Sequence, residues 1–100
     1  MATKREFQES PVHQGEDEQI AYILDTTPWG GSPTSPSVVL KDGDTDVSSV
    51  NLSGSPSVSD DNITTPAVID LTAGRRYRLE IKFTISGNVF EAYGDIIGEE

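Results

Sequence analysis

The stretch LTAGRRYRLEIKFTISGNVFEAYGDII, residues 71–97, carries the most regular pattern in this chain of 100 residues. From Tyr77 to Ile85, apolar side chains alternate strictly with charged or hydroxyl side chains. After a short polar break, a similar alternation resumes between Phe90 and Ile96. A period of two is typical of a β-strand that has one buried and one solvated face. The stretch therefore predicts a β-hairpin of two long strands.

The alternation also predicts how the two strands are paired. A two-residue turn at Gly87 and Asn88 would set Ile85 opposite Phe90, and every further inward residue would meet an inward partner. A three-residue turn would instead place a carboxylate on the core side. We therefore predict the two-residue Gly-Asn turn.

The predicted register gives the solvated face a mixed charge. Glu80 lies opposite Asp95, and Arg78 and Lys82 lie diagonally within reach of Asp95. The basic residues of the hairpin would then neutralise acids of their own sheet, or they would be available to a partner. Both interpretations are compatible with the sequence.

The rest of the chain predicts short strands separated by turns, with no segment of helical period. We expect a first strand around Phe7 that ends at Pro11, and a turn over residues 13–18. Further strands are expected over residues 18–26, which would be covered on both faces or lie against a terminus, and over 37–41 and 47–52. A brief strand is expected at Val58, and an extended segment over 63–71 carries Pro66, which suits an edge strand or a bulge. The stretch 27–37, rich in proline and glycine, is expected to be a loop. Together these segments predict an all-β sandwich or barrel of about seven short strands.

Composition limits the domain organisation and the class of protein. We expect residues 1–5 to form a flexible N-terminus and residues 6–98 to form one domain. There are no cysteines, which excludes disulfides and thiolate metal sites. The net charge of −10 argues against direct binding to nucleic acid. No apolar run reaches the roughly 18 residues of a membrane span. We therefore expect synthesis in the cytoplasm, with no membrane partner.

The turn that leads into the hairpin resembles a known structural motif. Leu71, Gly74 and Tyr77 are spaced as in the tyrosine corner of fibronectin type III and related immunoglobulin-like domains. The resemblance implies that Leu71 plugs the end of the core, Gly74 lets the chain reverse, and the Tyr77 hydroxyl bonds to the backbone a few residues upstream. It implies an immunoglobulin-like antiparallel β-sandwich.

A wider resemblance concerns the pattern between Phe7 and Ile97. It is similar to small acidic immunoglobulin-like proteins encoded among phage and prophage structural genes. These proteins have a strand, a Trp-containing turn, the leucine–glycine–tyrosine segment and a closing apolar hairpin. The resemblance implies a non-enzymatic virion protein, or a virion-assembly protein, of the head–tail region, whose partners are other virion proteins or copies of itself.

No pattern in the sequence indicates a catalytic or metal site. Asp42, Asp44 and Asp46 alternate as in the start of a calcium loop, but Val47 and Ser53 stand where that loop needs glycine and glutamate. A polar turn is the preferred interpretation. The single histidine, His13, has no associated nucleophile motif, so we expect no enzyme, no cofactor and no small-molecule substrate.

Two surfaces remain as candidates for partner binding. The first is the solvated face of the hairpin, with Arg76, Arg78, Lys82 and Tyr93. The second is the loop around Trp29, which would bind a ligand or surface as immunoglobulin-like end loops do. A lone Trp in such a loop is more often a plug over the end of a small core.

Overall fold

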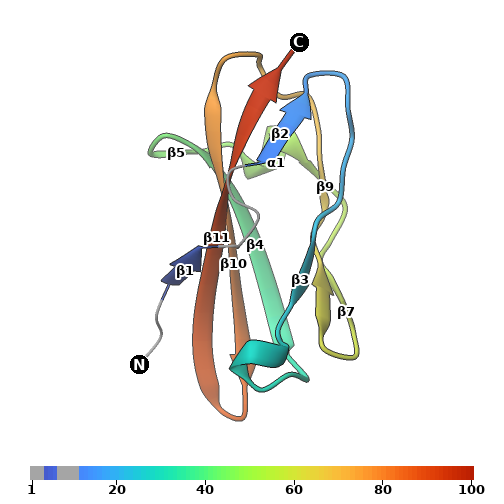
Figure 1. Cartoon of the computed structure of the whole chain (residues 1–100), viewed down its shortest axis with the longest axis vertical. Helices are drawn as coiled ribbons and strands as arrows, with labels where there is room; N and C mark the ends of the chain where they lie inside the picture. Colours follow the sequence, from blue (N-terminus) through green and yellow to red (C-terminus); the bar gives the residue numbers. More distant parts are fainter. Residues whose placement is uncertain (1–3, 7–11) are drawn as a thin grey trace.

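Two long antiparallel strands, β10 (Arg76–Ile85) and β11 (Asn88–Glu99), form the centre of the larger sheet in the computed structural model. The structure describes residues 4–6 and 12–100 (Figure 1). On the far side of β10 lies β4 (Thr34–Asp42), which turns into β5 (Thr45–Asp46). On the far side of β11 lie β1 (Lys4–Glu6) and β2 (Val12–Gly15), and both run parallel to β11.

Shorter strands form the layer that faces this sheet. In one group, β8 (Asn62–Thr64) lies between β3 (Ile23–Asp25) and β7 (Ser57–Ser59). In the other, β6 (Leu52–Ser53) pairs with β9 (Ala67–Val68). Two helical turns, η1 (Thr27–Trp29) and α1 (Ser48–Asn51), connect strands. Figure 1 shows β3 and β7 on one side of the molecule and the long strands on the other.

The core lies between the two layers in two apolar clusters. One cluster surrounds Phe83 and Ile63 near the hairpin tip, and the other surrounds Leu40 and Leu79 near the opposite end. The inward residues of β10 are all buried, from Tyr77 to Ile85. The predicted all-β sandwich is confirmed, with the parallel pairing of β1 and β2 added to an otherwise antiparallel arrangement.

The predicted position of the hairpin turn was wrong by one residue. The turn consists of Ser86 and Gly87, and Ile85 lies opposite Asn88 instead of Phe90. Both turn residues have positive φ, 50° and 81°, which is the backbone of a type I′ turn. Glycine is most favoured at the second position of that turn, so Ser-Gly satisfies it better than Gly-Asn. The register moves by two residues, and each side chain therefore stays on its predicted face.

The corner before β10 has the predicted geometry. Leu71 is buried, Gly74 has a φ of 86°, and the Thr72 N–H donates to the Tyr77 hydroxyl oxygen at 2.9 Å. Strand β11 passes close to this corner, where a Cβ on Gly98 would collide with the Thr72 carbonyl oxygen. The local contacts therefore agree with those implied by the tyrosine-corner resemblance.

Several predictions for the shorter segments need correction. Residues 47–52 form the turn α1 followed by β6, because Asp46 and Ser48 bond locally and close a helical turn. The predicted turn at 13–18 is strand as far as Gly15, because β11 extends far enough to pair with it. β4 begins at Thr34, inside the predicted loop, with Ser35 at a φ of 51° and a shift in register near Pro36.

Three further predictions concern β3, the strand at Val58 and the first residues. β3 covers only residues 23–25 and is buried on one face, since Leu24 is buried whereas Ala21 and Ile23 are exposed. The brief strand at Val58 is confirmed as part of β7. The predictions for residues 1–3, for Phe7 and for Pro11 lie outside the described residues, whereas Lys4 and Arg5 lie in β1.

Candidate interaction face

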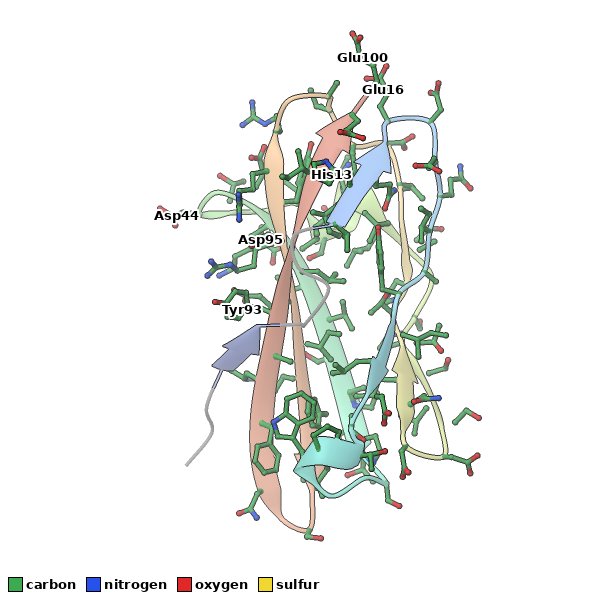
Figure 2. The ribbon with its side chains drawn as sticks, viewed as in Figure 1. His13, Glu16, Asp44, Tyr93, Asp95 and Glu100 are labelled. Atoms are coloured by element: carbon green, nitrogen blue, oxygen red, sulfur yellow. The ribbon has the colours of Figure 1, made fainter. Side chains whose placement is uncertain are left out.

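The solvent side of β4, β10 and β11 gathers most of the chain's basic side chains. We call this surface the outer face. Paired positions in the register define it, namely Ser37, Val39 and Lys41 of β4, Arg76, Arg78, Glu80 and Lys82 of β10, and Glu91, Tyr93 and Asp95 of β11. Figure 2 shows Tyr93, Asp95 and Asp44 on the side of the long strands that faces away from β3 and β7. Four of the five predicted partner-binding residues therefore lie on one surface.

Asp95 is the electrostatic centre of the outer face. Its side chain is only 9% exposed, and it accepts hydrogen bonds from Arg76 Nη2 at 2.7 Å and Nε at 3.1 Å. Arg78 Nε lies 3.4 Å from its other oxygen. One carboxylate thus holds two guanidinium groups, which are themselves about half exposed. Because the register differs from the predicted one, Arg78 lies directly opposite Asp95 and Lys82 lies opposite Glu91.

Arg78 also contacts the aromatic ring beside Asp95. Its guanidinium carbon lies 4.3 Å from the centroid of Tyr93, within the range of a cation–π interaction. The ion pair on one side and the ring on the other restrict the rotamers of Arg78. A planar, positively charged surface is therefore held in place before any partner arrives.

Two hollows lie side by side on the outer face. One, of about 430 Å³, is lined by residues that include Lys41, Arg76 and Arg78. The other, of about 310 Å³, is lined by residues that include Val39 and Lys82. Glu80 belongs to both, and its carboxylate lies 3.9 Å from Lys41 Nζ. The outer face is therefore an uneven surface that carries both acidic and basic groups, and not a purely basic stripe.

Trp29, in η1, lies outside the outer face and packs against the core. Its ring meets Phe83 edge-on, with centroids 5.5 Å apart and an interplanar angle of 79°. Its indole Nε1 is buried without a hydrogen-bond partner among the described residues. Trp29 is partly buried against the cluster around Phe83, which is the geometry expected of a plug.

The acidic turn and the histidine have local structural partners. Asp42 accepts a hydrogen bond from Arg75 Nε at 2.7 Å, and Asp46 accepts one from the Ser48 N–H at 2.9 Å. The hydrogen bond with Asp42 raises the pKa of Arg75, and the bonds from Ser48 lower that of Asp46. His13 Nδ1 lies 2.9 Å from Glu99 Oε2 at the exposed end of β2.

The sequence pointed to Asp95 only as a diagonal neighbour of two basic residues. Its burial under two guanidiniums follows from the Ser-Gly turn, which shifts the register by two residues. The preference of type I′ turns for glycine at the second position was the signal that could have identified the burial of Asp95.

Among the described residues, no helix is long and apolar enough to cross a membrane. No protein-family model matches this chain, and comparisons with curated proteins and with solved structures found no similar protein.

Proposed function

We propose that this chain is a non-enzymatic structural protein that acts through protein–protein contacts on its outer face. The observation that carries the proposal is the stack of Arg78 between Asp95 and Tyr93, with a hollow next to it. Arginine and tyrosine are enriched among the residues that dominate binding energy at interfaces. Because contacts with Asp95 and Tyr93 already restrict this arginine, less side-chain entropy would be lost when a partner contacts it.

The process in which we propose that the chain acts is the assembly of virus particles. This part of the proposal rests on the resemblance to small acidic proteins of phage and prophage structural genes, and the partners would be other virion proteins or further copies of the chain. The outer face supports a partner with both acidic and basic groups, since its own charges are mixed. A strongly cationic or anionic partner such as nucleic acid would find no matching surface there.

The loop around Trp29 is a weaker candidate for binding. Trp29 packs against Phe83 and has its indole nitrogen buried, so its aromatic surface is largely used within the core. If the loop were a ligand site, Trp29→Ala would keep the thermal midpoint and lose binding. We expect a clear fall in the midpoint, as for removal of a core aromatic residue.

The experiment compares two conservative substitutions of arginine. The chain is produced together with the proteins encoded beside its own gene, and its amount in sedimented particles is measured. Arg78→Lys keeps a positive charge beside Asp95 but loses the planar stack on Tyr93, so we expect incorporation to fall about tenfold. Arg75→Lys is the matched control, because Arg75 forms its ion pair with Asp42 outside the stack.

Charge reversal is less informative at these positions. Replacing Arg76 or Arg78 by glutamate would bring a second carboxylate beside the buried Asp95 and so destabilise the sheet as well as the surface. Equal incorporation of Arg78→Lys and Arg75→Lys would show that the outer face is not the contact. Absence of the unmodified chain from particles would refute the role in assembly.

A further inference from the structure

β3 has an open backbone edge in the second layer. The even-numbered residues around β3 bond to the neighbouring segments: Ile20 exchanges hydrogen bonds with Val68, the Thr65 N–H donates to the Tyr22 carbonyl, and the Thr26 N–H donates to the Asp61 carbonyl. Leu24 lies opposite Ile63 in the same ladder. In an antiparallel ladder the odd-numbered residues then direct their N–H and C=O groups away from β8.

The outward backbone groups belong to Ala21, Ile23 and Asp25. Within the described part of the chain, no backbone hydrogen bond to these groups is formed outside the β3–β8 ladder. Among the strands that the structure describes, the order ends at β3 on this side. The Ile23 side chain, on the solvent face of β3, is 66% exposed. An exposed edge with a large apolar side chain is a template for pairing with another strand.

The free edge of β4, in the other sheet, is blocked, in contrast to the edge of β3. Pro36 has no N–H to offer, and Ser35 breaks the strand with a positive φ. Further along, the Leu40 N–H and carbonyl are taken by Ser48 Oγ and the Val47 N–H. Proline and an irregular backbone are two of the devices by which natural sheets avoid edge pairing, and β3 has neither, although it is only three residues long and ends at the charged Asp25.

We propose that β3 pairs with β3 of a second copy of this chain, antiparallel and about a two-fold axis at Ile23. In this register Ile23 lies opposite its own copy and exchanges both backbone hydrogen bonds with it. Ala21 lies opposite Asp25 of the other copy, so the carboxylates do not face each other. The two β3–β8–β7 sheets become one continuous sheet, and the two exposed Ile23 side chains cover each other on its surface.

A second copy fits this edge because the strand is complementary to itself. Its three outward residues place the apolar side chain on the axis and one acid at a single end, so an antiparallel copy sets Ala21, and not a second acid, opposite Asp25. The net charge of −10 on each copy opposes the association. The pairing should therefore be weak at low ionic strength and should strengthen as salt screens the repulsion. It is independent of the outer face.

The test measures molar mass as a function of concentration, by light scattering on the full chain between about 10 μM and about 1 mM, the range of weak association. We expect a shift from the monomer mass of 10.8 kDa toward twice that value, at lower concentration in about 0.5 M salt than in about 0.05 M salt. Ile23→Lys should weaken the association at least about tenfold, since two ammonium groups would meet on the axis.

Val50→Lys is the matched control. Val50 is also 66% exposed and lies in α1, away from the β3 edge. Its substitution by lysine changes the net charge by the same amount as Ile23→Lys does. Ile23→Pro is a second disruptive variant, because it removes the outward N–H and leaves the bonds to β8 in place. Circular dichroism establishes that each variant is folded. In the dimer, the exchange of the Ile23 amide hydrogen should slow as concentration rises.

Two results would overturn the proposal. One is a molar mass that stays at the monomer value at about 1 mM protein in about 0.5 M salt. This result would overturn the pairing of two copies even if an added extended peptide were found to bind at the edge of β3. The other is a dimer that Ile23→Lys weakens no more than Val50→Lys does. Arg78→Lys should leave the dimer unchanged, so failure of the outer-face proposal is distinguishable from failure of this one.

Discussion

β10 and β11 pair along the whole of β10, from Arg76 opposite Ile97 to Ile85 opposite Asn88. β3 and β8 pair only between residues 23 and 25 of β3. The long strands are held by a continuous backbone ladder and a regular apolar face, whereas the short strands depend on individual polar side chains. The two layers of one sandwich therefore differ in which residues their stability depends on.

The polar side chains that hold the second layer are mostly buried. Gln14 is fully buried and donates to the carbonyls of Val68 at 2.7 Å and Glu18 at 3.0 Å, while the Tyr22 hydroxyl donates to its oxygen. Burial, with Glu18 nearby, raises the pKa of Tyr22. Asn51 donates to the carbonyls of Ile69 and Asp70 at the other side of the layer.

The largest loss of stability should come from removing a large apolar side chain that packs between the two layers. Phe83 is fully buried and contacts Trp29 and Phe90. Phe83→Ala should lower the free energy of unfolding by about 3–5 kcal/mol, measured by urea denaturation. Val89→Ala, on the exposed part of the same hairpin, is the control and should change it by less than about 0.5 kcal/mol. Similar losses for both variants would contradict the assigned core.

The difference between the layers is tested directly at Gln14. Gln14→Leu leaves two carbonyls and the Tyr22 hydroxyl without their partner in a buried site, so we expect a loss of about 2–3 kcal/mol. Hydrogen exchange should accelerate in residues 20–26 and 63–68 before it does in β10. Gln19→Leu, at an exposed position, is the control. Uniform acceleration in both layers would show that they do not differ in this way.

A smaller effect is expected at the corner that precedes β10. Tyr77→Phe removes the acceptor of the Thr72 N–H but keeps the buried ring. The free energy of unfolding should fall by about 1 kcal/mol, the usual contribution of one such bond. Tyr93→Phe serves as the comparison on the outer face. No loss at Tyr77 would mean that Leu71 and Gly74 alone hold the corner.

The smallest effect concerns acid stability at the end of β3. Hydrogen bonds from the Thr27 hydroxyl and N–H lower the pKa of Asp25 below its ordinary 3.8. These bonds to the ionised Asp25 stabilise the folded state above pH 3.8, and this stabilisation is lost as pH falls through the lower pKa that Asp25 has in the folded state. Asp25→Asn should flatten this part of the stability profile, measured by thermal unfolding between about pH 2 and pH 5. Thr27→Val should flatten it in the same direction, and an unchanged profile in both variants would refute the assignment.

The sequence predicted the layer of β10 and β11 best, because apolar and polar residues alternate regularly along these strands. The alternation from Tyr77 onward gave both faces of β10 and β11, and Leu71, Gly74 and Tyr77 gave the corner. The turn was misplaced by one residue because Gly-Asn and Ser-Gly turns preserve the same faces, so face matching alone could not distinguish them. The burial of Asp95 was missed for that reason.

The second layer was less predictable because its strands are two or three residues long. Such strands are too short for a period to be measured, and their positions depend on distant partners such as Gln14 and Asn51. Residues 47–52 alternate as a strand would, yet Asp46 and Ser48 close a helical turn there. Tertiary contacts and local side-chain bonds outweighed the pattern in this case.

The parallel pairing of β1 and β2 with β11 has a mechanical consequence. Tension applied to the chain before β1 and after β11 would pull neighbouring parallel strands in opposite directions along their length. The hydrogen bonds between Val12–Gly15 and the end of β11 would then be loaded in shear, all at once, and not opened one after another. With this connectivity, β1 and β2 would have to slide along β11 before the rest of the described chain could extend.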